Sequence, residues 1–144
     1  MRKIAATAVV FLLAVMMTAC AGGSAGPSAM FGSNQVVKVE ISESRGFGVF
    51  HAKPFLTFEG EDAAGTIERI ARAIREAEKQ PGIVDIAAPE YDVRLTYRDG
   101  STEAFHLWLD ARYEHATIMD VRDTHYIYRV SAESTKDLLE IIGE

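Results

Sequence analysis

The chain has 144 residues and a net charge of −6, an acidic balance that argues against non-specific binding to nucleic acid or to an anionic membrane surface. Its apolar content of 48% is ordinary for a globular protein, and its length suits one domain with a single hydrophobic core. The single cysteine, Cys20, excludes an intramolecular disulfide. We therefore expect one acidic domain and no nucleic-acid partner.

The N-terminal residues predict export and lipidation. Residues 2–3 are basic, and residues 5–17 carry no charge, a length that suits a signal peptide and is too short to span a bilayer as a helix. The following sequence, Met-Thr-Ala-Cys ending at Cys20, resembles the lipobox of bacterial lipoproteins, although leucine is commoner at the position of Met17. The alternative is an ordinary secretory signal with an incidental cysteine. We expect residues 1–19 to be a lipoprotein signal peptide and Cys20 to be diacylated.

Lipidation would place the protein at the cell membrane, facing the extracytoplasmic side. Residues 20–34 are rich in glycine, alanine and serine and predict a flexible, lipid-anchored tether, so the domain should span residues 35–144. Removal of residues 1–19 leaves 13 basic and 21 acidic residues, a charge of −8, which favours solubility.

The first part of the domain predicts two strands joined by a glycine-containing loop. Apolar residues alternate with polar ones over residues 37–41, and a second strand is expected at residues 55–58, directly after Pro54. The two glycines within residues 44–48 lack the lysine and the following helix of a nucleotide-binding loop. We therefore expect a bulge or a tight turn there.

Residues 61–79 predict a long helix that ends before Pro81-Gly82. Its apolar residues recur at helical spacing, at Ile67, Ile70, Ala71, Ile74 and Ala77. A basic edge follows the same spacing, at Arg69, Arg72, Arg75 and Lys79. This edge would either dock an anionic partner or form a solvated face paired with nearby glutamates, and we favour the second.

Residues 91–97 and 104–109 predict a β-hairpin around Asp99-Gly100, because apolar and polar residues alternate in both. The length of the loop decides which residues face each other. A two-residue loop would send the aliphatic side chains of the second strand to the polar face of the first. A one-residue slip of this kind exposes a whole set of side chains that should be buried.

A three-residue loop over residues 98–100, with its glycine in the left-handed conformation, corrects the register. Val93 then faces Phe105, and Tyr91 faces Leu107. We prefer this register because both strands then bury their apolar side chains on the same face.

The same register defines a candidate binding face on the polar side of the hairpin. It places Asp92 opposite His106, with Arg94 and Trp108 nearby. An exposed tryptophan on a tethered domain predicts a partner site, because tryptophan and arginine are enriched at interface hot spots. The alternative is that Trp108 only packs, over the stem of Arg94 or under the loop at residues 46–48.

The last part of the chain predicts two more strands and a helix. The strands are expected at residues 115–121 and 124–130, around a turn at residues 122–123. Ser131 or Ser134 would cap the final helix. We infer an α+β fold, a single domain with an antiparallel sheet of about five to six strands and two helices packed on one face.

Several short stretches together resemble one family. They are Gly46-Phe47-Gly48, Gly82-Ile83-Val84-Asp85, Pro89-Glu90-Tyr91-Asp92, Tyr97-Arg98-Asp99-Gly100-Ser101, His106-Leu107-Trp108-Leu109 and Asp123-Thr124. They resemble the YhfM-like domain of lipoproteins from Gram-positive, spore-forming bacteria, over about residues 36–142. The resemblance implies a small lipid-anchored extracytoplasmic domain. It implies no established activity, so it assigns no catalytic residue.

The histidines do not predict a metal site. There are four, at His51, His106, His115 and His125. No pair has the i, i+4 spacing of helical metal ligands, and we expect neither a metal nor another cofactor. With the turn at residues 122–123, His125 is expected opposite Asp120.

Catalysis would have to use Asp92 and His106, with Asp92 orienting His106 as a general base. Nothing in the sequence supplies a nucleophile or an oxyanion hole, and a cross-strand ion pair explains the two residues equally well. We therefore expect a non-catalytic binding or accessory module whose partner is an unknown extracytoplasmic protein or ligand. The alternative is a small hydrolase or metal-binding protein that uses the Asp92/His106 face.

Overall fold

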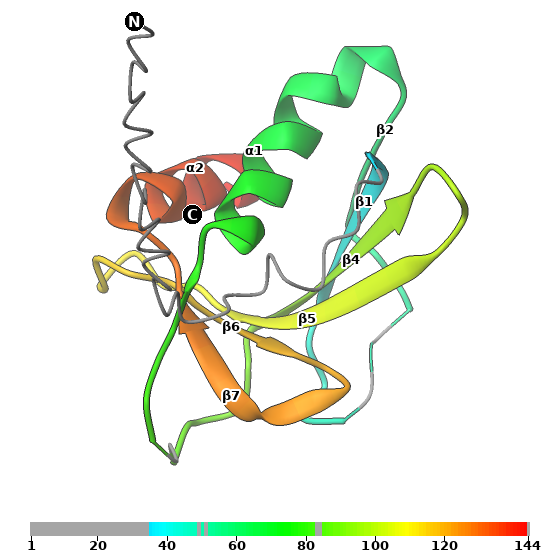
Figure 1. Ribbon diagram of the computed structural model, residues 1–144. Helices are drawn as coiled ribbons and strands as arrows, with labels where there is room; N and C mark the ends of the chain where they lie inside the picture. Colours follow the sequence, from blue (N-terminus) through cyan, green and yellow to red (C-terminus); the bar gives the residue numbers. More distant parts are fainter. Residues whose placement is uncertain (1–34, 49, 51, 83–84, 144) are drawn as a thin grey trace, which may run out of the picture.

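The computed structural model describes residues 35–48, 50, 52–82 and 85–143. The expected signal peptide, Cys20 and the tether therefore lie outside the described residues. Figure 1 shows two layers, a twisted antiparallel sheet and two helices that lie side by side against one of its faces. In the part of the chain that the structure describes, no helix is both long and apolar enough to cross a membrane.

The strands and helices follow one another in an order close to the predicted one. In chain order they are β1 (Val36–Glu43), β2 (Leu56–Glu59), a 3₁₀ turn η2 (Glu61–Ala63), α1 (Ala64–Arg75), β3 (Glu78–Lys79), β4 (Tyr91–Tyr97), β5 (Thr102–Trp108), β6 (Thr117–Asp120), β7 (Asp123–Arg129) and α2 (Ala132–Ile142). Within the described residues the strands form one seven-stranded sheet in the order β2-β1-β4-β5-β6-β7-β3. The α+β class is confirmed, and the strand count exceeds the predicted five to six.

The hairpin of β4 and β5 has the predicted three-residue register. Tyr91 pairs with Leu107, and Val93 pairs with Phe105. The turn closes through a hydrogen bond of 2.9 Å from the Gly100 N–H to the carbonyl of Tyr97, and Gly100 has a φ of 84°. Glycine is suited to this left-handed conformation because it has no Cβ to clash with the backbone.

The core lies between the sheet and the helices. Its fully buried side chains come from β1, β4, β5, β6 and the two helices, and include Val39, Ile41, Ile70, Ile74, Val93, Leu95, Phe105, Leu107, Ile118 and Leu138. Burial of each such aliphatic or aromatic side chain contributes about 1.5–3 kcal/mol. The apolar face of the hairpin therefore holds the sheet against the helices.

The long helix is shorter than predicted, because α1 ends at Arg75 and the predicted helical residues 78–79 form β3 instead. Glu78 pairs with Arg129 of β7, and Lys79 lies with its Nζ atom 3.1 Å from the centre of the Tyr126 ring. The helical spacing failed here because pairing with β7 satisfies backbone groups that a frayed last turn of the helix would leave open.

The basic edge of α1 mainly pairs with α2. Arg69 lies 2.7 Å from Asp137 and 2.8 Å from Glu140, and Arg72 lies 3.0 Å from Asp137. Hydrogen bonds from Arg69 lower the pKa of Asp137. Ser131, and not Ser134, is the N-cap of α2: its side chain accepts a hydrogen bond of 3.1 Å from the Ser134 N–H.

Candidate functional site

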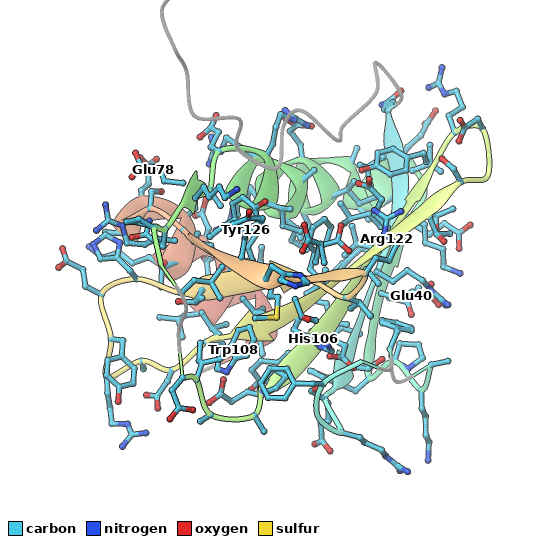
Figure 2. All side chains as sticks on the ribbon, turned by 60° about the horizontal axis from the view of Figure 1, so that its bottom comes forward. Glu40, Glu78, His106, Trp108, Arg122 and Tyr126 are labelled. Atoms are coloured by element: carbon cyan, nitrogen blue, oxygen red, sulfur yellow. The ribbon has the colours of Figure 1, made fainter. Side chains whose placement is uncertain are left out.

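A row of polar side chains crosses the neighbouring strands β1, β4 and β5 on the face that turns away from the helices. Ser42 of β1 pairs in register with Asp92 of β4, which pairs with His106 of β5. All three residues have an exposed fraction of 0%. Figure 2 looks onto this face and shows His106 and Trp108 in front of the helices. The polar face predicted from the hairpin is therefore covered at its centre.

Asp92 and His106 form a closely hydrogen-bonded pair. Nδ1 of His106 lies 2.7 Å from Oδ1 of Asp92, and Nε2 of His106 accepts a hydrogen bond of 3.3 Å from the Gly48 N–H. Because Nε2 accepts from a backbone N–H, the proton of the neutral imidazole is assigned to Nδ1, which donates it to Asp92. Both ring nitrogens are thus occupied.

The turn that contains Gly46 and Gly48 covers the pair. These glycines have φ angles of 107° and 81°, a left-handed conformation that other residues rarely adopt. Between them, Phe47 places its ring centre 5.9 Å from that of His106, edge to face, and 6.0 Å from that of Trp108. Phe47 itself is 47% exposed. It was not among the predicted site residues, although its position between two glycines was visible in the sequence.

Trp108 is only partly exposed and packs beside the turn at residues 46–48, while its role in binding a partner stays a prediction. Its Nε1 donates a hydrogen bond of 2.7 Å to the carbonyl of Ala87, and its ring lies beside Phe47 and 6.4 Å from His106. The covering turn is distant in sequence from the hairpin, whereas residues 85–90 directly precede β4. The alternation of β4 and β5 carried no signal for either.

Arg94 shares this face but turns towards β1. Its Nε and Nη2 atoms lie 2.8 and 2.7 Å from Oε2 of Glu40, and its guanidinium lies 4.7 Å above the ring of Phe50. Glu40 is 7% exposed and was not predicted as part of the face. Its place opposite Arg94 follows from the register of β1 with β4, which the sequence did not determine.

Two hollows adjoin the predicted face. One, of about 440 Å³, lies beside the covering turn and is lined by Phe47, Gly48, Asp85, Ile86, Met119 and Thr124. The other, of about 360 Å³, lies at the end of β5 next to Trp108 and includes Glu90, Arg112, Tyr113 and His115. The first lies directly beside the contacts made to His106.

The order of Ser42, Asp92 and His106 across the sheet differs from that of a catalytic triad. The Ser42 hydroxyl is buried and has no hydrogen-bond partner among the described residues. Asp92 lies between Ser42 and His106 in the sheet, whereas a serine nucleophile must lie next to the histidine that activates it. Asp92 and His106 therefore form a hydrogen-bonded pair, and this arrangement does not activate Ser42 as a nucleophile.

The other histidines are dispersed. Nδ1 of His115 lies 3.0 Å from the carbonyl of Val130, and His125 is exposed beside Asp123. The expectation that His125 lies opposite Asp120 is wrong: Asp120 pairs with Asp123, because the strands shift register after Ile118. In the described ranges no group of three or more His, Cys, Asp or Glu residues is placed to hold a metal ion.

Fold and site together define a two-layer α+β domain with a buried aspartate–histidine pair on the face opposite its helices. The YhfM protein family model matches residues 58–144, more than half of the chain, and the chain belongs to this family. No curated protein matches it. The lipoprotein part of the resemblance stays a prediction.

The fold is similar to that in the crystal structure of a thioesterase-like protein from Clostridium sporogenes. The TM-score is 0.53 at 12% sequence identity, and the similarity covers 74% of this chain and 93% of that chain. At this identity the likeness concerns the fold alone.

Proposed function

We propose that this protein is a lipid-anchored extracytoplasmic domain that binds a protein or ligand through the outer face of its hairpin and catalyses no reaction. The observation that carries the proposal is that His106 is fully buried and both of its ring nitrogens have hydrogen-bond partners, Asp92 and the Gly48 N–H. In this arrangement Nε2 reaches no substrate proton. Withdrawal of the turn would expose Nε2 as a hydrogen-bond acceptor, and Ser42 would still lie on the far side of Asp92.

The anchor is supported by the sequence outside the described residues. The charge-free residues 5–17 lead directly to the Met-Thr-Ala-Cys motif at Cys20. Two or more acyl chains hold a protein on a membrane stably, where one chain binds only marginally. Fourteen residues, 21–34, separate Cys20 from the domain. Fully extended, they would span about 50 Å, enough to let the hairpin face reach partners at the membrane surface.

A small hydrolase is the second candidate, favoured by the thioesterase-like structural neighbour and by the Ser42 hydroxyl, which has no hydrogen-bond partner among the residues that the structure describes. It would need the covering turn to withdraw from His106. It would also need a nucleophile beside Nε2, and Ser42 lies on the far side of Asp92. Binding needs only the withdrawal of the turn, whereas hydrolysis also needs the nucleophile, and this makes binding the better-supported function.

The anchor is tested by the intact mass of the mature protein purified from membranes. We expect an acylated N-terminal cysteine in the wild type and loss of both the acyl mass and stable membrane attachment in Cys20→Ala. A wild-type N-terminus without acyl groups would remove the lipoprotein assignment.

The binding face is tested by crosslinking and recovery of partners from membranes. We expect Trp108→Ala to abolish recovery of a specific partner, and Tyr126→Ala, which changes an aromatic side chain on β7 that is 40% exposed, to leave it unchanged. Hydrolysis of a short-chain acyl thioester by the same preparations tests the second candidate, and activity lost in His106→Gln would favour it.

A further inference from the structure

The turn at Gly46–Gly48 lies over His106 and Trp108. It contacts them through the ring of Phe47 and the N–H group of Gly48. The ring of Phe47 lies 5.9 and 6.0 Å from the rings of these two residues, and the Gly48 N–H lies 3.3 Å from Nε2 of His106. That hydrogen bond is longer than the usual range, and nearly half of Phe47 is in solvent. The turn is thus held by weak contacts.

The imidazole beneath the turn is a fixed acceptor. Asp92 takes the Nδ1 proton of His106 at 2.7 Å, so Nε2 presents its lone pair towards the turn. A buried carboxylate is costly to desolvate, and such a pair contributes little net stability. Departures from an apolar core are expected at functional or strained sites. The pair therefore fits a receptor for a hydrogen-bond donor.

The hollow beside the turn gives room for a small molecule. Its volume of about 440 Å³ falls within the range of about 300–1,000 Å³ that is usual for ligand sites. Met119 and Ile86 supply apolar lining, and a thioether makes favourable contacts with aromatic rings. Asp85 and Thr124 add polar groups.

We propose that the position over His106 and Trp108, which Phe47 fills in this structure, binds a small phenolic molecule. Its ring replaces Phe47 against His106 and Trp108, and its hydroxyl replaces the Gly48 N–H as the donor to Nε2. The glycines on both sides of Phe47 give the turn the backbone freedom to withdraw. The inference names the ligand class for the binding role proposed above and rests on that role, but not on the lipid anchor.

The test uses the full chain in detergent micelles with ¹⁵N-labelled tryptophan. Because the chain has one tryptophan, the indole N–H signal belongs to Trp108, whose ring lies beside Phe47 and His106. We expect p-cresol to shift this signal saturably. The matched probe 4-methylanisole has the same ring with a blocked hydroxyl, and we expect it to bind at least tenfold more weakly.

Two variants test the replacement of Phe47. In Phe47→Ala the ligand no longer competes with the protein's own ring, so the apparent Kd for p-cresol should fall at least threefold. Phe55→Ala is the control, because Phe55 is 48% exposed, close to the value for Phe47, but its ring packs 5.9 Å from that of Tyr91. The Kd of Phe55→Ala for p-cresol should equal that of the wild type.

Equal affinities for the two probes, a shift that does not saturate, or a Phe47→Ala affinity no higher than that of Phe55→Ala would each overturn the phenolic site. Such a failure is distinguishable from failure of the proposed function. If Trp108→Ala still loses its membrane partner while p-cresol does not bind, the binding role stands and the ligand class is wrong.

Discussion

The two faces of the sheet are built from the same alternating strands but are buried in different ways. On the helix face, neighbours such as Val93 and Phe105 are apolar and packed under α1 and α2. On the outer face, Asp92 and His106 are equally inaccessible, but they are polar, and the turn at residues 46–48 covers His106. The comparison teaches that burial on one face follows from the hydrophobic pattern, and on the other from the packing of one sequence-distant turn over a hydrogen-bonded pair.

The largest expected effect is a difference in the free energy of unfolding between variants of two neighbouring residues of β5 that point to opposite faces. Leu107→Ala should lower the free energy of unfolding by about 2–5 kcal/mol, because the side chain is 1% exposed in the core. Trp108→Ala should cost less than about 2 kcal/mol, since the ring is partly exposed and loses one hydrogen bond worth about 0.5–1.5 kcal/mol. Urea unfolding measures both. Equal large losses would show that the two faces contribute alike to stability.

The second prediction concerns the polar pair. Asp92→Ala should cost about 1–3 kcal/mol, because it leaves the buried Nδ1–H of His106 without this acceptor. The double variant Asp92→Val with His106→Leu should cost less than Asp92→Ala alone, because replacing both partners by apolar groups leaves no unsatisfied donor. Denaturant unfolding of the two variants decides this, and a double variant at least as unstable as the single one would mean that the pair itself stabilises the outer face.

The sequence predicted the helix face well because period-2 alternation and the left-handed Gly100 sufficed to choose the hairpin register. It predicted the helix too long, because the pairing of residues 78–79 with β7 is a tertiary interaction that helical spacing does not encode. The site was found in part. Asp92 opposite His106 followed from the register, whereas the covering of the pair by Phe47 and Gly48 depends on a loop 58 residues away from His106.

The third prediction tests how far the outer face depends on that loop. Gly48→Ala meets no atom within 4 Å, so its cost comes only from a φ of 81°, about 1–2 kcal/mol. Because this strain lies in the turn, it should raise the hydrogen-exchange rate of the Trp108 indole N–H and leave amides of the helix face, such as that of Phe105, protected. Uniform acceleration at both would indicate that the faces open together.

The smallest effect is expected at an ion pair that belongs to neither face. In the loop after β5, hydrogen bonds from the Arg112 side chain and backbone lower the pKa of Asp110 to about 2. A carboxyl with a lowered folded-state pKa contributes stability above its unfolded value of about 3.9 and loses that contribution as the pH falls through about 2. Because the loop is solvent-exposed, the midpoint of the NMR titration of Asp110 should move up towards the ordinary range in Arg112→Gln, which keeps the backbone hydrogen bond, without a measurable change in urea unfolding at pH 7. A loss of stability at neutral pH as large as that of Asp92→Ala would show that polar pairs stabilise this protein irrespective of burial, and the distinction between the covered pair and an exposed one would disappear.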